Sequence, residues 1–268
     1  MTPRILTASL LASLLSAPPV LALSQDDLLA ADLRPGWRTE TGGHMAALDL
    51  RLAPGWKTYW RAPGTTGIPP EFDWSGSENL AAVNIHWPRP HVFVFNGLQS
   101  IGYHDTLTLP FEVTPLDPAL PVTLRLQVDL GICKDVCLPA SVTLDTVLSG
   151  EGAADPVIAA ALSDRPIPAD QAGLAGIGCT LDPISDGLRL TATMDLPAQG
   201  DSETVVFETA TSGVWVSEAS SDRSGNRLVA SSDMVPPDAA PFALDRSGVT
   251  VTVIGPDRAV EITGCPAP

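Results

Sequence analysis

Alternating apolar and polar residues mark the strongest strands of the chain. Every second residue from Val122 to Leu130 is apolar, and the residues between them are polar or charged. This period of two predicts a half-buried strand. The segments Thr106–Val113 and Ser141–Leu148 alternate in the same way, whereas His44–Leu52 alternates only loosely. Pro-Gly and Pro-Pro pairs separate the runs, as expected for strands joined by turns.

The pattern changes after Leu148 and later returns. Residues 149–176 are rich in Ala, Gly and Pro, and Asp155 followed by Pro156 predicts the start of one short helix. Strand-like runs then resume in the segments Leu188–Met194, Thr204–Glu208, Val214–Glu218, Arg227–Ser231 and Val249–Ile254. Short strands spaced by turn residues predict a second β-sandwich. We therefore expect a first β domain over residues 23–150, a linker with a short helix over 151–176, and a second β-sandwich domain over 177–268.

The N-terminus has the features of a secretory signal peptide. Arg4 precedes an apolar run, Ile5–Leu15, and small residues end at Ala22. The alternative is a membrane anchor, but the run is too short to span a bilayer. We expect cleavage of residues 1–22 and a periplasmic mature chain that is not inserted in the membrane. Residues 24–36 are polar and acidic, and we expect them to form an arm or a short helix that begins at Ser24.

Composition and charge narrow the function. Charged residues are only 17% of the chain, while 26 Pro and 22 Gly suit β domains with many turns. A net charge of −16 disfavours binding to nucleic acid or anionic lipid, and is typical of a well-solvated acidic surface. The sequence has neither the nucleophile elbow of hydrolases nor a phosphate-binding loop.

The four cysteines form two natural pairs. Cys133 and Cys137 are separated by Lys134, Asp135 and Val136, between two predicted strands, so they are expected at a hairpin tip. Such a short ring gains little loop-closure entropy. Lys134 would favour a thiolate and Asp135 would oppose it. On spacing alone an ordinary stabilising disulfide leads, while redox exchange and binding of a soft metal such as copper(I) remain open.

The other two cysteines bracket the last third of the chain. A bridge between Cys179 and Cys265 would close a loop of about 87 residues, which the chain-entropy model values at about 4.6 kcal/mol. We expect this structural disulfide to tie the first strand of the second domain to the C-terminus; a second redox pair is the alternative. The four histidines show no metal-binding spacing, and no metal ligands or cofactor are assigned.

Three sequence blocks in order resemble a known family. They are Gly55-Trp-Lys-Thr-Tyr-Trp-Arg-Ala-Pro-Gly64 with the following residues to Trp74, then Trp87–Pro110, then Gly131-Ile-Cys133-Lys-Asp-Val-Cys137-Leu-Pro139. Over residues 37–150 the chain resembles the N-terminal periplasmic domain of DsbD-type thiol:disulfide interchange proteins, and most of all the branch of the copper-tolerance homologue ScsB. The resemblance implies an immunoglobulin-like β-sandwich with a redox-active cysteine pair.

The resemblance also implies residue roles and partners. Cys137 would form mixed disulfides with partners and Cys133 would resolve them, while Phe95, with Phe93 and Tyr103 nearby, would shield the pair. The family relays electrons from a membrane-embedded thiol hub to periplasmic thioredoxin-like oxidoreductases. Some members carry acidic residues before the shielding Phe, where this chain has Phe93 and Val94.

The sequence departs from the best-known members in one further respect. It shows neither their multi-helix membrane domain nor their thioredoxin-like domain, so we expect the electron donor to act in trans. The resulting hypothesis is periplasmic thiol:disulfide exchange by a component of a protein-disulfide reductase. The alternative is a periplasmic copper-handling or protein-binding module, in which Cys133 and Cys137 are metal ligands or a structural disulfide.

Overall fold

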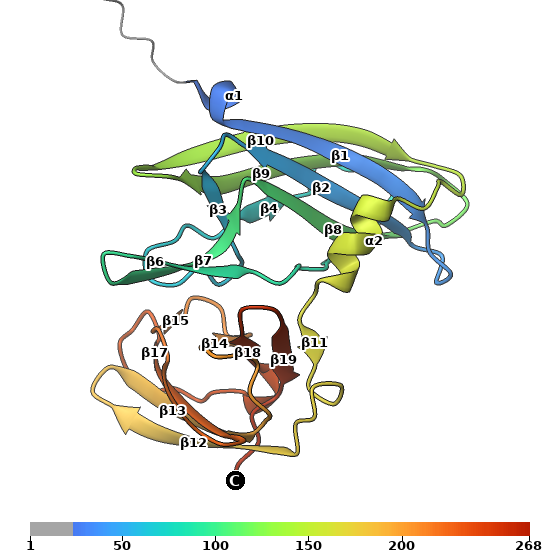
Figure 1. The fold of residues 1–268 in the computed structure, drawn as a ribbon. Helices are drawn as coiled ribbons and strands as arrows, with labels where there is room; N and C mark the ends of the chain where they lie inside the picture. Colours follow the sequence, from blue (N-terminus) through green and yellow to red (C-terminus); the bar gives the residue numbers. More distant parts are fainter. Residues whose placement is uncertain (1–23) are drawn as a thin grey trace, which may run out of the picture.

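The computed structural model describes residues 24–268, and the predicted signal peptide lies outside them. The described chain is almost entirely β-structure, in two parts joined near one short helix (Figure 1). The prediction of a β-sandwich followed by a second β domain is confirmed. Within residues 24–268, no helix has the length and apolar character needed to cross a membrane.

The first domain is a sandwich of two antiparallel sheets. One sheet has the strand order β1-β2-β8-β5, and the other has the order β10-β9-β3-β7-β6 with β4 beside β9. The first sheet consists of β1 (Leu29–Arg38), β2 (His44–Leu52), β8 (Thr106–Pro115) and β5 (Leu80–Ile85). The second consists of β10 (Cys137–Leu148), β9 (Val122–Cys133), β3 (Lys57–Tyr59), β7 (Leu98–His104), β6 (His91–Phe95) and β4 (Glu71–Asp73).

The core of this domain follows from the predicted alternation. On β9 the apolar residues are buried and the residues between them are mostly exposed, so the strand turns one face to the other sheet. Trp60 and Phe111 are the largest fully buried side chains in this core. Burial of an aromatic side chain of this size stabilises the fold by about 1.5–3 kcal/mol.

β2 alternates loosely because both of its faces are covered. Leu48 and Leu50 face the main core, while Met45 and Ala47 on the opposite face pack against Ile158 of the short helix α2 (Pro156–Ser163). A strand buried on both sides has no need of polar residues at alternate positions.

Helix α2 begins where the sequence predicts. The Asp155 carboxylate accepts hydrogen bonds from the backbone N–H groups of Val157 (2.8 Å) and Ile158 (3.4 Å). Pro156 takes the first helical position, where its missing N–H has no cost. The helix contacts β8. The segment 151–176 therefore contains a helix that is fixed to the first domain, not a free linker throughout.

The start of the described chain protects a sheet edge. Of the arm or short helix expected over residues 24–36, only α1 (Gln25–Leu28) is helical, and the residues from Leu29 onward belong to strand β1. The Gln25 amide donates to the carbonyl of Ser141 (2.9 Å) and accepts from its N–H (3.1 Å). Ser141 lies on β10, the outermost strand of its sheet. The side chain of Gln25 thus fills hydrogen-bonding positions that a neighbouring strand would otherwise use.

The second domain also contains two sheets. Their strand orders are β11-β19-β18-β14 and β12-β13-β17-β15, with β16 beside β17. The first sheet consists of β11 (Ile167–Pro168), β19 (Ala259–Thr263), β18 (Val249–Ile254) and β14 (Thr204–Thr209). The second consists of β12 (Gly176–Ile184), β13 (Gly187–Asp195), β17 (Arg227–Val235), β15 (Trp215–Val216) and β16 (Ser220–Ser224); a 3₁₀ turn, η1 (Arg246–Gly248), precedes β18. β11 lies in the segment that the sequence assigns to the linker.

The two domains pack against each other. In Figure 1, β14, β18 and β19 lie beneath β6 and β7 of the first domain. Ile254 and Ala259 are buried in the same apolar cluster as the core of the first domain, and Val206 packs against that cluster. The apolar contact joins the first domain to the sheet that contains β14, β18 and β19.

Candidate redox site

The hairpin between β9 and β10 carries the Cys133–Cys137 disulfide. The two cysteines are directly opposed in the strand register, with Cα atoms 4.2 Å apart. The intervening loop is closed by a hydrogen bond from Lys134 N–H to the carbonyl of Val136 (3.3 Å). The predicted hairpin tip is therefore present. Pro139 lies inside β10 opposite Gly131, which is possible because an edge strand tolerates proline.

The two cysteines differ in their access to solvent. Cys133 is only 5% exposed, whereas Cys137 is exposed together with the loop residues before it. Thiol–disulfide exchange requires in-line approach of a thiolate to one sulfur. Of the two cysteines, Cys137 is therefore the more accessible one, and the division of roles between them stays a prediction.

A tyrosine from a distant part of the sequence contacts the exposed cysteine. The Tyr59 hydroxyl lies 3.2 Å from the Sγ of Cys137. Burial raises the pKa of Tyr59, so at neutral pH the phenol keeps its proton and can donate it in a hydrogen bond. Tyr59 lies in the first of the three sequence blocks but was given no role from sequence, because a strand of three residues has no readable alternation.

Gly131 lets the tyrosine pack closely against the hairpin. A Cβ atom at Gly131 would lie 2.8 Å from the Cβ of Ile68 and 3.0 Å from the ring of Tyr59. The contact with Ile68 is shorter than real Cβ atoms make and the contact with the Tyr59 ring is tighter than most, so a larger residue would force Ile68 to shift and press on the ring. The glycine therefore serves close packing beside the disulfide.

The two lysines near the disulfide donate hydrogen bonds to other segments. Lys134, considered from sequence as a thiolate-stabilising charge, donates from Nζ to the carbonyl of Pro54 (3.2 Å). Lys57 is opposite Cys133 in the strand register, but its Nζ donates to the Ser100 hydroxyl (2.8 Å). Burial lowers the pKa of Lys57. Both cations fix neighbouring segments around the hairpin.

The proposed shielding residues lie on the neighbouring β6–β7 hairpin. Asn96 and Gly97 form its turn with φ values of 51° and 79°, as a turn pair of this type requires. Phe95, beside the turn, is 69% exposed. The ring of Phe93 packs under the Nζ of Lys57 at 4.9 Å. The shielding role of Phe93 and Phe95 stays a prediction.

Tyr103, the third proposed shielding residue, is buried. Its hydroxyl donates to the carbonyl of Pro88 (2.8 Å). Burial raises the pKa of Tyr103 well above its ordinary value, and the phenol stays neutral. In this arrangement Tyr103 anchors the segment that leads into β6, and its proposed place near the shield is likewise still a prediction.

The second cysteine pair is joined deep in the second domain. Cys179 on β12 and Cys265 after β19 form a disulfide with Cα atoms 5.5 Å apart, and both residues are at most 1% exposed. The guanidinium of Arg246 donates to the carbonyls of Cys179 (2.8 Å) and Cys265 (3.3 Å). A bridge this inaccessible suits the structural role that the sequence suggests, in contrast to the hairpin pair.

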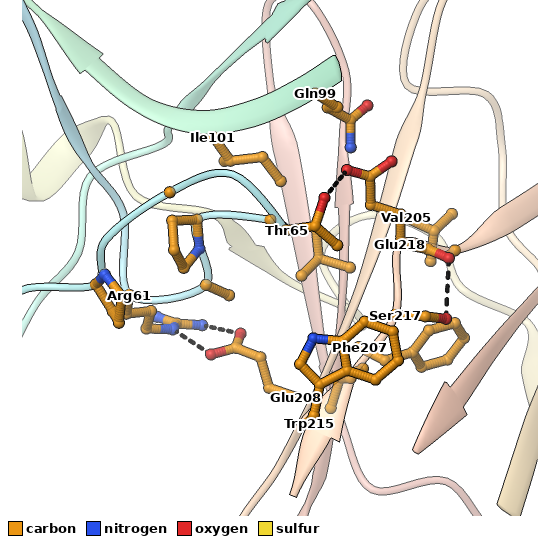
Figure 2. Close-up of a pocket in the computed structure, with 18 of the residues that line it drawn as sticks. Arg61, Thr65, Gln99, Ile101, Val205, Phe207, Glu208, Trp215, Ser217 and Glu218 are labelled. Atoms are coloured by element: carbon orange, nitrogen blue, oxygen red, sulfur yellow. Dashed lines mark hydrogen bonds and ion pairs between the residues drawn. The ribbon is translucent and has the colours of Figure 1, made fainter. Parts of the chain in front are cut away.

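Other candidate sites are limited. Among residues 24–268, no group of three or more His, Cys, Asp or Glu side chains converges as a metal site would require. A cleft of about 480 Å³ lies between the domains, lined on one side by the segment Arg61–Pro69 and on the other by β14 and β15 (Figure 2). Neither cysteine of the hairpin pair is among its lining residues.

The fold and the disulfide hairpin define a class. The β-sandwich presents one accessible and one buried sulfur at the end of a rigid hairpin, which is the arrangement of a thiol:disulfide interchange module. Residues 25–149 match the family model described as "Thiol:disulfide interchange protein DsbD, N-terminal". This part of the chain matches the DsbD N-terminal domain, as the resemblance of the three blocks implies.

A solved structure extends the likeness to nearly the whole chain. The crystal structure of the N-terminal periplasmic domain of ScsB from Proteus mirabilis has a TM-score of 0.66 and 22% sequence identity, and the match covers 92% of this chain and 96% of that chain. At this identity the comparison shows a shared fold, including the second domain. No curated protein sequence matches the chain.

Proposed function

We propose that Cys133 and Cys137 form a redox-active pair that exchanges electrons with other proteins through mixed disulfides. The observation that carries this proposal is the asymmetry of the pair, with Cys137 exposed and Cys133 5% exposed at the tip of one hairpin. The family match of residues 25–149 supports it. A structural staple would gain little here, because closing a ring of five residues is worth only about 2 kcal/mol in the chain-entropy model.

The first half of the exchange loads the pair with two electrons. A thiolate of a reduced donor attacks the Sγ of Cys137, the Cys133–Cys137 bond breaks, and Cys133 leaves as a thiolate. The second donor thiolate then attacks the donor sulfur of this mixed disulfide and releases Cys137 as a thiolate. The donor ends as a disulfide and the pair ends as a dithiol.

The second half passes the two electrons on. The Cys137 thiolate attacks an acceptor disulfide and forms a new mixed disulfide, releasing one acceptor thiolate. Cys133 then attacks Cys137, restores the internal disulfide and releases the second acceptor thiolate. Tyr59, 3.2 Å from the Sγ of Cys137, donates a hydrogen bond to the Cys137 thiolate in the reduced form.

We propose a periplasmic relay as the setting of this exchange. The donor is a membrane-embedded thiol protein and the acceptors are thioredoxin-like oxidoreductases, in keeping with the family of residues 25–149. The printed description of the ScsB structure, an N-terminal periplasmic domain, supports the compartment. Around the exposed sulfur, Val136 (64% exposed) and Ile68 (40% exposed) offer apolar contact to such partners.

The proposed domain limits follow the sequence analysis. Residues 23–150 form the exchange domain, 151–176 connect it to the next domain, and 177–268 form the second domain. The sheet pairings support a division within the connecting segment, because every strand of the first two sheets precedes Ser149 and every strand of the last two follows Asp164. β11 lies in this segment and pairs with β19, so the sheets of the second domain begin before residue 177.

The deciding experiment is trapping of partners in cells. In a Cys133→Ala variant the mixed disulfide at Cys137 cannot be resolved internally, so we expect disulfide-linked complexes that disappear on reduction. A Cys133→Ala/Cys137→Ala variant is the matched control and should trap nothing. A variant lacking Cys179 and Cys265 should still exchange. If Cys133→Ala traps no protein, or if the double variant traps the same ones, the proposed exchange is wrong.

A further inference from the structure

One short segment contacts both the redox site and the second domain. Arg61–Pro69 follows β3 directly, two residues after Tyr59, and then turns along the interdomain cleft. Figure 2 shows its side chains extending toward the second domain from one wall of this cleft. The segment therefore lies where a change in one domain could reach the other.

Arg61 binds the second domain through a network of charges. Its guanidinium makes a two-point contact with the Glu208 carboxylate (2.9 and 3.0 Å) and a further hydrogen bond to Glu261 (2.6 Å). Burial opposes the charge of Arg61, but the two glutamates raise its pKa above the ordinary value. The guanidinium also stacks on the ring of Trp60, 4.6 Å from its centre. A planar, two-point pair of this kind fixes orientation, which an ammonium group cannot do.

A second contact crosses the cleft four residues later. The Thr65 hydroxyl donates to the Glu218 carboxylate (2.9 Å), beyond strand β15 (Figure 2). Glu208 and Glu261 lie on β14 and β19, in the sheet whose residues Ile254 and Ala259 are buried in the core of the first domain. The segment is thus attached to a part of the second domain that is itself firmly packed.

The other side of the segment supports the redox hairpin. A Cβ atom at Gly67 would lie 2.9 Å from the Tyr59 ring, so the backbone at Gly67 rests directly against that ring. Ile68 meets the hairpin at Gly131, where an added Cβ atom would lie 2.8 Å from the Cβ of Ile68. The ring of Tyr59 is therefore held between this segment and the hairpin, with its hydroxyl on Cys137.

We propose that Arg61 is a positioning residue of the redox site, through which the second domain holds the segment Arg61–Pro69 against Tyr59 and so keeps the Tyr59 hydroxyl on Cys137. This proposal rests on the proposed function of the Cys133–Cys137 pair. It gives the second domain a defined task, which is to set the stability of the reduced pair from outside the exchange domain. Contiguous packed elements can carry coupling of this kind, and the contacts of Arg61, Gly67 and Ile68 form such a route.

The expected effect has a definite direction. The Tyr59 hydroxyl stabilises the Cys137 thiolate more than the disulfide, because hydrogen bonds to charged acceptors are the stronger ones. Loosening the segment therefore favours the oxidised form. For Arg61→Gln we expect the equilibrium constant for reduction by glutathione to fall about threefold, which corresponds to about 14 mV at 29.6 mV per tenfold change. Arg61→Lys, which keeps the charge without the two-point geometry, should show an intermediate fall.

The test measures the glutathione equilibrium of the full chain well below its unfolding temperature. Arg189→Gln is the matched control, because Arg189 makes a two-point pair with Asp233 (2.7 and 3.0 Å) that lies within the second domain. It should leave the equilibrium unchanged. If Arg61→Gln does not fold, two other variants weaken the same contact between the segment and the second domain. Glu208→Gln removes a charge that pairs with Arg61, and Thr65→Val removes the hydrogen bond to Glu218.

A double-mutant cycle identifies the route of the effect. In a Tyr59→Phe background, Arg61→Gln should change the equilibrium much less than in the wild type, since the hydroxyl that it positions is gone. An equal change in both backgrounds, or no change from any of the attachment variants, would overturn the proposal. If the wild-type pair itself fails to exchange with glutathione, the proposed function fails, and this result is distinguishable from failure of the coupling alone.

Discussion

The Tyr59 hydroxyl lies 3.2 Å from the Sγ of Cys137, although the two residues are 78 positions apart in the sequence. The contact joins strand β3 to the exposed half of the disulfide and leaves the buried half, Cys133, without it. In the reduced protein this places a hydrogen-bond donor beside the sulfur that partners reach. The asymmetry of the pair thus concerns both solvent access and the stability of the thiolate.

Removal of that hydroxyl should slow the reaction of the reduced pair. In Tyr59→Phe the ring still fills the space beside Gly131, but the Cys137 thiolate loses a hydrogen bond worth about 1 kcal/mol. We expect the rate of alkylation of Cys137 at neutral pH to fall about fivefold, measured by mass spectrometry after timed treatment with iodoacetamide. Tyr103→Phe is the control, because its hydroxyl binds Pro88 instead; an equal fall in both variants would contradict the assignment.

A methyl group at Gly131 should disturb both packing and chemistry. The added Cβ would meet Ile68 at 2.8 Å and the Tyr59 ring at 3.0 Å. Overpacking of this kind costs about 1–3 kcal/mol. We therefore expect Gly131→Ala to lower the free energy of unfolding by that amount in a urea titration, and to slow exchange with a small dithiol.

Gly176→Ala is the matched control for that substitution. Gly176 is also at a strand position, but no atom lies within 4 Å of the place its Cβ would take, and its φ is not positive. The control should unfold like the wild type and exchange at the same rate. A neutral Gly131→Ala would show that the hairpin and the Ile68 segment are not packed as described.

The two disulfides should contribute very differently to stability. Cys179–Cys265 joins residues 86 positions apart, and in the chain-entropy model its loss costs about 4.6 kcal/mol. The hairpin disulfide spans 4 positions, and its loss costs about 2 kcal/mol by the same model. Denaturant unfolding of the two double-alanine variants measures the difference. A larger loss from the Cys133/Cys137 variant would mean that the hairpin bridge is a staple.

The charged Asp155 carboxylate should stabilise the N-terminus of helix α2, and protonation at low pH should remove this stabilisation. Burial raises the pKa of Asp155, but hydrogen bonds from Val157 and Ile158 and the Arg34 guanidinium outweigh this and lower it overall. A lowered pKa in the folded state means that the stabilisation is present above the unfolded value, about pH 4, and is lost as the pH falls below it. At neutral pH, Asp155→Ala should cost about 1 kcal/mol.

Unfolding experiments at two pH values check this prediction. The difference between Asp155→Ala and wild type should be full at pH 7 and should shrink toward pH 3. Asp201→Ala is a suitable control, because Asp201 is exposed in a loop and its carboxylate makes no hydrogen bond within the described residues. A difference that is independent of pH would show that the cap acts without its charge.

Local patterns predicted the strands that carry a recognisable apolar period or an apolar run. β2, β8, β9, β10 and β18 lie where alternation or an apolar run places them, and the hairpin tip follows from the strands on either side. β1 was not predicted because Pro35 and Gly36 interrupt its pattern, and the structure shows a register shift between Arg34 and Trp37. β16 is a polar edge strand, and it therefore has no apolar period to detect.

Contacts between distant segments could not be predicted from these patterns. Tyr59 and Cys137 meet because β3 pairs with both β7 and β9, a result of sheet topology that no local period contains. Arg61 and Glu208 are 147 positions apart and meet only when the second domain docks. The three sequence blocks identified the exchange domain, but the attachment to the second domain came from the folded chain alone.

The two hydrogen bonds between Gln25 and Ser141 have a consequence for self-association of the protein. β10 is an outermost strand, and such a strand is a template on which a second copy can extend the sheet. The amide of Gln25 uses the free N–H and carbonyl groups of Ser141, a few residues from Cys137. Pairing of β10 with a strand of a second copy is therefore less favourable. Gln25 thus leaves the strand that begins at Cys137 with fewer free hydrogen-bonding groups for a second copy of the chain to pair with.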